Sequence, residues 1–136
     1  MMGSDVTIMS VTPSSCSKED DLCNAKEIVR RVKVAAANLG VGPPADDWIE
    51  SQVHYIEDYY GEDYGFPTEA ATKAIKELAN REALFTDPVY TGKAFSGLLD
   101  HIRTGKIAPG SNVCFIHTGG TGALFAGEEL TGPITR

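Results

Sequence analysis

The amino-acid sequence predicts an α/β domain with a mostly parallel sheet. Segments with strand character alternate with amphipathic helical segments, and an apolar run near the C-terminus leads into a glycine-rich turn. The length of 136 residues suits about one domain, and a composition that is 42% hydrophobic and 23% charged is typical of a globular protein. Such a chain can bury a core without disulfides or metals.

The net charge and the cysteine content exclude several classes of partner and site. A net charge of -7 repels polyanions such as nucleic acid and anionic lipid. Cys16, Cys23 and Cys114 have no metal-ligand spacing, and their odd number argues against a disulfide framework. No apolar run approaches membrane-spanning length, and no signal-peptide pattern is present. We therefore expect a cytoplasmic protein with no metal, nucleic acid or membrane partner.

The chain is predicted to open with a strand and a helix. Residues 5–11 alternate apolar and polar side chains and stop before Pro13, which indicates a short strand. Ser17, three residues before Asp20, is placed to cap a helix that Gly40 would end. The apolar positions of that helix are Leu22, Ala25, Val29, Val32, Ala36 and Leu39. Because no polar tail precedes the strand, we expect the chain to start in mid-domain.

A connector, a second strand, a loop and a second helix should follow. Prolines make residues 41–47 a connector, and residues 48–56 suit a strand better than a helix. Residues 59–67 are predicted to form a loop rich in tyrosine, glycine and acidic side chains. Thr68 can cap a helix that runs to about Asn80. Its expected buried side chains are Ala71, Ile75 and Leu78.

The last third of the chain is predicted to contain a short strand, a third helix and a buried strand. Residues 83–86 form a short apolar stretch that Asp87 and Pro88 interrupt. The helix that follows should end near Gly105 and bury Phe95, Leu98, Leu99 and Ile102. Residues 112–117 include four consecutive apolar side chains, which favours a strand buried on both faces.

Three segments could carry chemistry. The glycine turn at 118–122 follows a predicted strand, and ligands of α/β sheets collect at such carboxyl ends. It matches neither a Walker loop nor a dinucleotide fingerprint, so a plain strand-to-helix turn is an equal alternative. Tyr90 and Tyr64 lie at turns before helices, where a phenol can donate, accept or lose a proton. Packing of the ring is the alternative for each tyrosine.

Three motifs together resemble one enzyme family. DYGFPTE at 63–69, DPVYTGKA at 87–94 and FIHTGG at 115–120 are similar to the last third of D-cysteine desulfhydrases and aminocyclopropane-carboxylate deaminases, and the likeness extends from about residue 5 to 126. The resemblance implies a tryptophan-synthase-β-like fold with pyridoxal phosphate between two domains, and homodimers. Residues 1–136 would be the C-terminal portion of that enzyme, a partial three-layer α/β/α domain truncated at its N-terminus.

The resemblance also implies roles for particular residues. Tyr90 is similar to the tyrosine that faces the cofactor and the reacting carbon of the substrate, and Tyr64 to a second active-site tyrosine. Two phenols in these places can move protons. Thr118 is similar to the residue near the pyridine nitrogen, and Gly119 and Gly120 would make room for the ring. The glycine turn is then expected to face the ring rather than bind a phosphate.

Thr91 distinguishes the two activities of the family. In the deaminases a glutamate follows the tyrosine of this motif and pairs with the ring nitrogen, whereas Thr91 occupies that place here. A carboxylate keeps the pyridinium charged more strongly than a hydroxyl does. The resemblance therefore favours D-cysteine desulfhydrase, which releases pyruvate, sulfide and ammonia, over ring-opening deamination.

The lysine that the family uses for its Schiff base, and its cofactor-phosphate loop, lie upstream of the matching region. Lysines such as Lys73, Lys76, Lys93 and Lys106 read as surface residues, and Lys93, close to Tyr90, reads as a first-turn surface lysine. We therefore expect no independent catalysis. The alternatives are a non-catalytic module that docks on an intact homologue or binds a small amino acid, an aminocyclopropane-carboxylate deaminase and, remotely, a nucleotide-binding enzyme.

Overall fold

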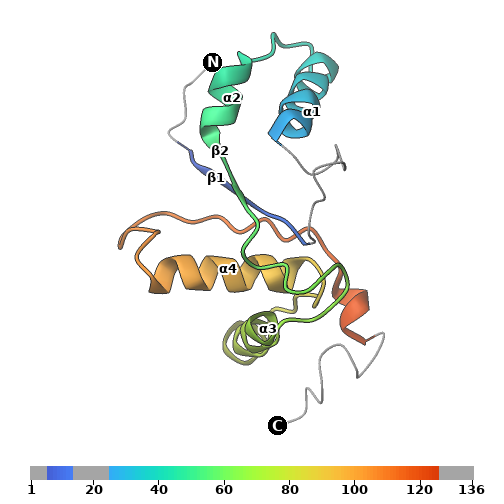
Figure 1. Ribbon diagram of the computed structural model, residues 1–136, viewed down its shortest axis with the longest axis vertical. Helices are drawn as coiled ribbons and strands as arrows, with labels where there is room; N and C mark the ends of the chain where they lie inside the picture. The colour runs from blue at the N-terminus through green and yellow to red at the C-terminus, as the bar shows by residue number, and fades with distance from the viewer. Residues whose placement is uncertain (1–5, 14–24, 126–136) are drawn as a thin grey trace. The chain divides into compact units, whose positions relative to one another are not determined.

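The computed structural model describes residues 6–13 and 25–125 (Figure 1). Two compact units divide the chain: residues 1–12 and 16–56 form the strand unit, and residues 13–15 and 57–136 form the tyrosine unit. The elements in chain order are β1 (Ile8–Val11), α1 (Ala25–Asn38), α2 (Asp46–Gln52), β2 (Val53–Ile56), α3 (Glu69–Glu82), α4 (Thr91–Arg103) and a 3-10 helix (Thr121–Phe125).

The two strands of the strand unit run parallel. Ile8 of β1 is opposite Val53 of β2, and Val11 is opposite Ile56. The ladder continues by one bond, in which the backbone N–H of Thr12 donates to the carbonyl of Ile56 at 3.0 Å. Because α1 and α2 lie between the two strands in the chain, this is the helical crossover that a parallel pair needs. The predicted α/β class with a parallel sheet is confirmed.

Helix α1 buries two of the apolar side chains that its periodicity predicts, leaves Val32 half-buried and exposes the one at its end. Val29 and Ala36 are each 7% exposed, whereas Leu39 is 78% exposed. The prediction for Leu39 is wrong because the helix ends one residue earlier, at Asn38, and Gly40 then takes a φ of +68°. The predicted cap and its neighbours lie outside the described residues: Ser17, Asp20 and Leu22.

The prediction of one strand over residues 48–56 is wrong in its first half. Helix α2 takes these residues up to Gln52, together with the last two residues of the predicted connector. Asp46 and Asp47 lie in its first turn, where acidic side chains stabilise the positive end of the helix dipole. Ile49 is 3% exposed on the inner face of the helix. Favourable helix ends and burial therefore outweigh the strand propensity of these side chains.

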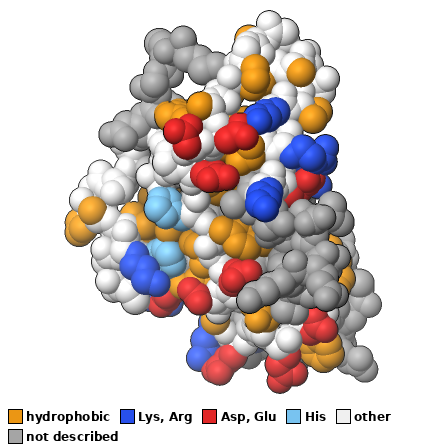
Figure 2. Space-filling model, turned by 45° about the horizontal axis from the view of Figure 1, so that its top comes forward, with side chains coloured by type: hydrophobic (Ala, Val, Ile, Leu, Met, Phe, Trp, Pro, Cys, Tyr) orange, Lys and Arg blue, Asp and Glu red, His pale blue; other side chains and the backbone are white. Residues whose placement is uncertain are grey.

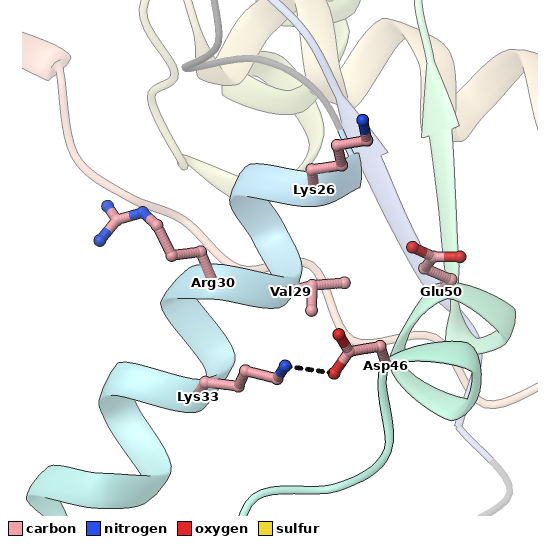
Figure 3. A pocket seen from close by; sticks show the side chains of 6 residues that line it. All are labelled: Lys26, Val29, Arg30, Lys33, Asp46 and Glu50. Carbon is pink, nitrogen blue, oxygen red and sulfur yellow. Dashed lines mark ion pairs between the residues drawn. The ribbon is translucent and has the colours of Figure 1, made fainter.

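A shallow surface pocket of about 420 Å³ lies between α1 and α2 (Figure 3). The Lys33 ammonium crosses it to Asp46 at 2.5 Å. Its lining is Lys26, Val29, Arg30, Lys33, Asp46 and Glu50. None of the predicted site residues lines this pocket.

Helix α3 forms as its cap and periodicity predict. The hydroxyl oxygen of Thr68 accepts a hydrogen bond from the backbone N–H of Ala71 at 3.1 Å. Ala71 and Ile75 are buried, as expected for the apolar face. The helix runs slightly beyond the predicted end, to Glu82, and stops at Ala83, which takes the left-handed φ of 54°.

Helix α4 is confirmed as a helix, but its predicted buried face is wrong. Phe95, Leu98 and Leu99 are only half-buried, and Ile102 is 48% exposed. The buried face is small and polar instead, and consists of Thr91, Gly92, Lys93, Ser96, Gly97 and His101.

Two glycines explain the buried face of α4. A Cβ at Gly92 would lie 2.8 Å from the side chain of Ile75, and one at Gly97 would lie 2.9 Å from the ring of Tyr59. The side chains of Ile75 and Tyr59 therefore contact the backbone of α4 directly, and larger side chains at these two positions would prevent that contact. Figure 1 shows α3 almost end-on where α4 lies across the view, so the two helices cross steeply.

Two segments predicted as strands are unpaired among the described residues, and Ala83 at the start of the first takes a left-handed φ of 54°. Residues 83–86 and 112–117 have no ladder partner in that part of the chain. Val113 is 48% exposed and Ile116 is 71% exposed, so the prediction of a strand buried on both faces is wrong here. Burial of a strand requires neighbouring strands and covering helices, which the described residues do not supply.

The surface carries mixed charge. On the face in Figure 2, acidic and basic side chains lie close to one another, without the basic stripe that nucleic-acid binding requires. Within residues 6–13 and 25–125, no helix is long and apolar enough to cross a membrane.

Candidate functional site

The two predicted site tyrosines meet in the tyrosine unit. Tyr64 comes from the loop before α3, and Tyr90 is the N-cap residue of α4. Their hydroxyl groups share a hydrogen bond, and their rings pack edge to face with centroids 5.8 Å apart. Tyr64 is 54% exposed and Tyr90 is 45% exposed, so both phenols reach solvent. The structure thus brings together two groups that can exchange a proton.

The contact changes the acidity of Tyr90. The hydrogen bond with the Tyr64 hydroxyl raises the pKa of the Tyr90 phenol above its ordinary value, and partial burial raises it further. The ordinary pKa of this phenol, 10.0, already keeps Tyr90 protonated at neutral pH, and the further rise makes it a weaker acid.

Asp87 holds the backbone that carries Tyr90. One carboxylate oxygen of this wholly buried side chain accepts hydrogen bonds from the backbone N–H groups of Val89 at 2.8 Å and Tyr90 at 2.7 Å. Burial raises the pKa of Asp87, but the bonds from Thr91, Tyr90 and Val89 outweigh it, and the pKa lies below its ordinary value. Sequence reasoning treated Asp87, with Pro88, as the interruption of the apolar stretch at 83–86 and missed this role, although an aspartate just before a helix is a capping signal.

Thr91 makes three hydrogen bonds with Asp87. Its hydroxyl donates to a carboxylate oxygen of Asp87 at 2.6 Å and accepts from the backbone N–H of Asp87 at 3.0 Å. Its backbone N–H donates to the same carboxylate oxygen at 2.8 Å. Because a hydroxyl has one proton and two lone pairs, Thr91 keeps one lone pair for a further donor and has no proton to offer.

The glycine turn lies beside the same aspartate. Gly120 has a φ of +89°, and a Cβ on it would lie 2.7 Å from a carboxylate oxygen of Asp87. A ring nitrogen of His117, Nδ1, accepts from the backbone N–H of Gly119 at 3.1 Å, so Nε2 carries the proton that it gives to the carbonyl of Phe85 at 2.8 Å. These contacts fix the turn next to the residue that holds Tyr90.

Two of the predicted cofactor residues, Thr118 and Gly119, leave the turn open on one side. Thr118 is exposed, and Gly119 has a φ of +102° with open space where a side chain would be. A planar group can therefore approach the backbone of Gly119 closely. In the part of the chain that the structure describes, no cluster of metal-ligating side chains is present.

The prediction that Lys93 is a surface lysine is wrong. Its side chain is wholly buried, and its ammonium donates to the carbonyl oxygens of Tyr60 at 2.6 Å, Pro13 at 3.2 Å and Asp63 at 3.3 Å. Burial lowers the pKa of Lys93, while the nearby acids Asp63 and Asp87 oppose that shift. Backbone carbonyls thus replace water around the charge, and the amine is not free to react.

A groove of about 550 Å³ lies elsewhere in the tyrosine unit, between α3 and α4. Its lining is Tyr59, Glu69, Ala70, Lys73, Ala74, Glu77, Ser96, Leu99, Asp100 and Arg103. Neither Tyr64 nor Tyr90 lines it, so the candidate site is an open surface of the unit.

Comparison with known proteins gives a consistent result. The model of a family described as pyridoxal-phosphate dependent enzyme matches residues 1–119. A D-cysteine desulfhydrase of Salmonella typhi is 37% identical over 122 residues, which are 90% of this chain and 34% of that protein. The D-cysteine desulfhydrase of Salmonella schwarzengrund is 36% identical over the same length.

A solved structure shares the fold. The crystal structure of an ACC deaminase homologue superposes with a TM-score of 0.68 at 30% identity and covers 87% of this chain. The match takes in 32% of that solved chain. The present chain thus spans about a third of the length of the curated and solved relatives it matches.

Proposed function

The chain belongs to the pyridoxal-phosphate dependent enzyme family, and on this premise we propose that it is part of a lyase that converts D-cysteine to pyruvate, sulfide and ammonia. The named relatives support the substrate, since they are D-cysteine desulfhydrases. The observation that carries the proposal is the hydrogen-bonded pair of Tyr64 and Tyr90 beside the glycine turn. Lyase chemistry requires protons to be taken up and given at adjacent atoms, which such a pair can do.

Pyridoxal phosphate would lie against the turn formed by Thr118, Gly119 and Gly120. When bound, the cofactor supplies a sink for the electrons released as a bond to the substrate carbon breaks. Thr118 would offer its hydroxyl to the pyridine nitrogen, and Gly119 leaves open space for the ring, whereas the place of a side chain on Gly120 is taken by Asp87. Thr91 can only accept a hydrogen bond there, because Asp87 already receives its proton. That arrangement does not hold the ring nitrogen charged as a carboxylate would, which favours the desulfhydrase over the deaminase.

The two tyrosines would have separate roles. Tyr90 carries its proton at neutral pH and can donate it to the departing sulfur of the substrate, although the raised pKa makes it a weaker acid than an ordinary phenol. Tyr64, which is 54% exposed, can then replace the proton from solvent through the hydroxyl–hydroxyl bond. Asp87 keeps the Tyr90 backbone in place during this exchange.

We propose that the chain does not catalyse by itself. Lys93, the lysine that the sequence puts nearest to Tyr90, has its ammonium bound to three carbonyl oxygens. A protonated amine enclosed in this way cannot anchor the cofactor covalently. The anchoring amine would come from outside these 136 residues, in keeping with the one-third coverage of the relatives.

A titration of the purified chain with pyridoxal phosphate tests this point. We expect no absorbance band of an imine and no sulfide from D-cysteine. An imine band that disappears in Lys93→Met, together with sulfide release, would show that Lys93 anchors the cofactor and would contradict the proposal. Weak binding of cofactor or D-cysteine without chemistry would favour the alternative of a non-catalytic module.

A chimera tests the role of the tyrosines. The matching third of the Salmonella typhi D-cysteine desulfhydrase is replaced by this chain, and sulfide release from D-cysteine is measured. We expect Tyr90→Phe and Tyr64→Phe to lower the rate about 100-fold or more, the usual effect of losing a proton-transfer group. Tyr60→Phe, from the same loop, is the matched control and should change little. A chimera that releases ammonia from aminocyclopropane carboxylate, but no sulfide from D-cysteine, would favour the deaminase.

The proposal extends to association and location. Ile8 of β1 is 50% exposed and Met9 is 38% exposed, which supports docking of the strand unit onto a further copy or an intact homologue. Sedimentation of the chain, alone and mixed with a full-length homologue, tests this. The exposed free thiol of Cys114 supports the cytoplasm as the location.

A further inference from the structure

Lys93 occupies an unusual place for a lysine in the first turn of a helix. Its side chain is wholly buried, and within the described residues its ammonium has no carboxylate at ion-pair distance. It binds the carbonyl oxygen of Pro13 and the carbonyl oxygens of Tyr60 and Asp63. One cation therefore gathers carbonyls from two separate stretches of the chain.

Two of these carbonyls belong to the loop that presents Tyr64. Asp63 is the residue directly before Tyr64, and its carboxylate accepts the backbone N–H of Tyr64 at 2.7 Å. Its carbonyl oxygen, which Lys93 holds, also accepts the N–H of Phe66 at 3.4 Å. Asp63 thus joins the ammonium of Lys93 to the backbone of Tyr64 on one side and to the following turn on the other.

The other end of the arrangement is the α4 backbone. Lys93 is three residues after Tyr90, and the N–H of Ala94 donates to the carbonyl of Tyr90 at 3.0 Å in the same helical turn. Asp87 fixes the start of this turn through four hydrogen bonds. Because these bonds hold the helix end in place, a cation carried by this turn can hold the loop opposite.

The charge of Lys93 is needed for this contact. Burying an ammonium is costly unless dipoles or charges compensate. A neutral side chain of the same length would remove this donor from the carbonyls of Pro13 and Tyr60 and leave that of Asp63 with only the long bond from Phe66. The acids Asp63 and Asp87 add to the field that favours the charged form. The enclosing groups are those that a monovalent cation would bind, with the lysine in its place.

We propose that Lys93 is a positioning residue whose ammonium draws the Tyr60–Asp63 loop onto α4 and so holds the hydroxyl of Tyr64 against that of Tyr90. The inference rests on the proposed function in taking this tyrosine pair as the working site. The test of this inference needs neither cofactor nor turnover. An inactive chain or chimera would therefore contradict the proposed function but not the role of Lys93. Failure of the Lys93 test would contradict that role but not the chemistry proposed for the tyrosines.

The experiment is a double-mutant cycle on the full chain, read by NMR. Tyrosine is labelled with 13C at its ζ carbon, and the Tyr90 signal is assigned by its loss in Tyr90→Phe. In the unsubstituted background, Tyr64→Phe should lower the pH at which Tyr90 titrates, because the hydroxyl–hydroxyl bond is lost. In a Lys93→Met background the titration of Tyr90 should already be shifted down, and Tyr64→Phe should shift it no further.

Lys76→Met is the matched control, since it removes a lysine charge from α3 in the same unit. The effect of Tyr64→Phe on Tyr90 should be unchanged in that background. An equal effect of Tyr64→Phe in the Lys93→Met and unsubstituted backgrounds would overturn the proposal.

A second pair of variants separates the ammonium from the bulk of the side chain. Lys93→Cys, in a chain whose three native cysteines are replaced by serine, is alkylated while unfolded with 2-bromoethylamine or with a propyl halide and then refolded. The first product restores a lysine-like ammonium and the second is its uncharged isostere. Only the ammonium form should restore the effect of Tyr64→Phe. Restoration by both forms would mean that Lys93 acts by filling space, against the proposal.

If neither Lys93→Met nor the propylated Lys93→Cys folds, a measurement on the unsubstituted chain tests the inference. Lysine labelled with 15N should then show an ammonium at Lys93 whose protons exchange slowly and give cross-peaks to the amide of Tyr64. Protons that exchange as fast as those of the exposed Lys106 would refute the enclosed cation, and with it the inference.

Discussion

The strand unit and the tyrosine unit bury different kinds of side chain. In the strand unit, the buried helix positions are mainly apolar, as at Val29, Ala36 and Ile49, and the arginines that pair with Glu27 are about two-thirds exposed. In the tyrosine unit, one stretch holds six buried polar side chains. They are Thr86, Asp87, Thr91, Lys93, Ser96 and His101.

This difference shows where the chain buries costly polar groups whose partners fix the positions of neighbouring residues. Burying a polar group costs free energy unless each donor and acceptor finds a partner, and the partners then fix its position closely. Asp87 and Lys93 have such partners, and both lie within four residues of Tyr90. The strand unit resembles an ordinary scaffold, whereas the tyrosine unit holds a prearranged site.

Removing the buried carboxylate of the tyrosine unit should have the largest effect. Asp87→Ala leaves the N–H groups of Val89, Tyr90 and Thr91 without an acceptor, and we expect a loss of about 3 kcal/mol in the free energy of unfolding. Asp47→Ala in the strand unit, which removes an exposed acceptor for the N–H of Trp48, should cost less than about 1 kcal/mol. Urea titration followed by circular dichroism measures both. Equal losses of unfolding free energy in Asp87→Ala and Asp47→Ala would contradict the contrast between the two units.

The same carboxylate sets an acid limit for the tyrosine unit. Because the pKa of folded Asp87 lies below its ordinary value of 3.8, its contribution is present above that pH and is lost as the pH falls below it. In Asp87→Ala the loss of unfolding free energy below pH 3.8 that protonation of Asp87 causes should be absent. The variant should already be less stable than the unsubstituted chain at neutral pH.

Tyr59 should produce the next largest effect, at the opposite end of the pH scale. Burial and the 2.6 Å hydrogen bond from its hydroxyl to Asp100 raise its pKa from 10.0 to about 12. Stability from this protonated phenol is therefore present below pH 10.0 and is lost as the pH rises toward about 12. Tyr59→Phe should cost about 1 kcal/mol at neutral pH and abolish the alkaline loss. Thermal unfolding across pH 7 to 12, with Tyr60→Phe as control, would reveal a contrary pattern.

The helix ends of the two units offer a test of backbone strain. Helix α1 is followed by Gly40 at a φ of +68°, whereas α3 ends at Ala83 with a φ of 54°. A side chain disfavours this left-handed conformation, so Ala83→Gly should stabilise the chain by about 0.5–1 kcal/mol. Gly40→Ala should destabilise it by a similar amount. Chemical denaturation of both variants checks the signs, and a destabilised Ala83→Gly would contradict this explanation.

The ion pairs of the strand unit should give the smallest effect. Hydrogen bonds from Arg30 and Arg31, against a burial cost, lower the pKa of Glu27 from 4.5 to about 2. The small stability that it supplies should therefore be present above pH 4.5 and fade toward pH 2, and added salt should weaken it. Glu27→Gln should remove both dependences in an acid titration of helicity. If the acid transition is unchanged in Glu27→Gln, groups other than Glu27 cause the pH dependence of stability.

Local signals in the sequence predicted α1, α3 and α4, and the family motifs pointed to Tyr64 and Tyr90 as site residues. Thr68 caps α3, and Gly40 follows α1, because capping and backbone freedom act within a few neighbouring residues. Tyr64 and Tyr90 were identified as a pair from their motifs, and the structure joins their hydroxyls. The strand predicted over α2 was wrong because its side chains carry both propensities, and only packing of Ile49 decides between them.

Tertiary structure alone decided how the site is held. Lys93 in a first helical turn reads as a surface lysine, and nothing in its neighbours reveals that carbonyls from Pro13, Tyr60 and Asp63 converge on it. The same holds for the buried polar face of α4, which exists because Ile75 and Tyr59 approach its glycines. A sequence specifies helix ends and family motifs through neighbouring residues, whereas the burial of a charge depends on groups that only the folded chain brings together.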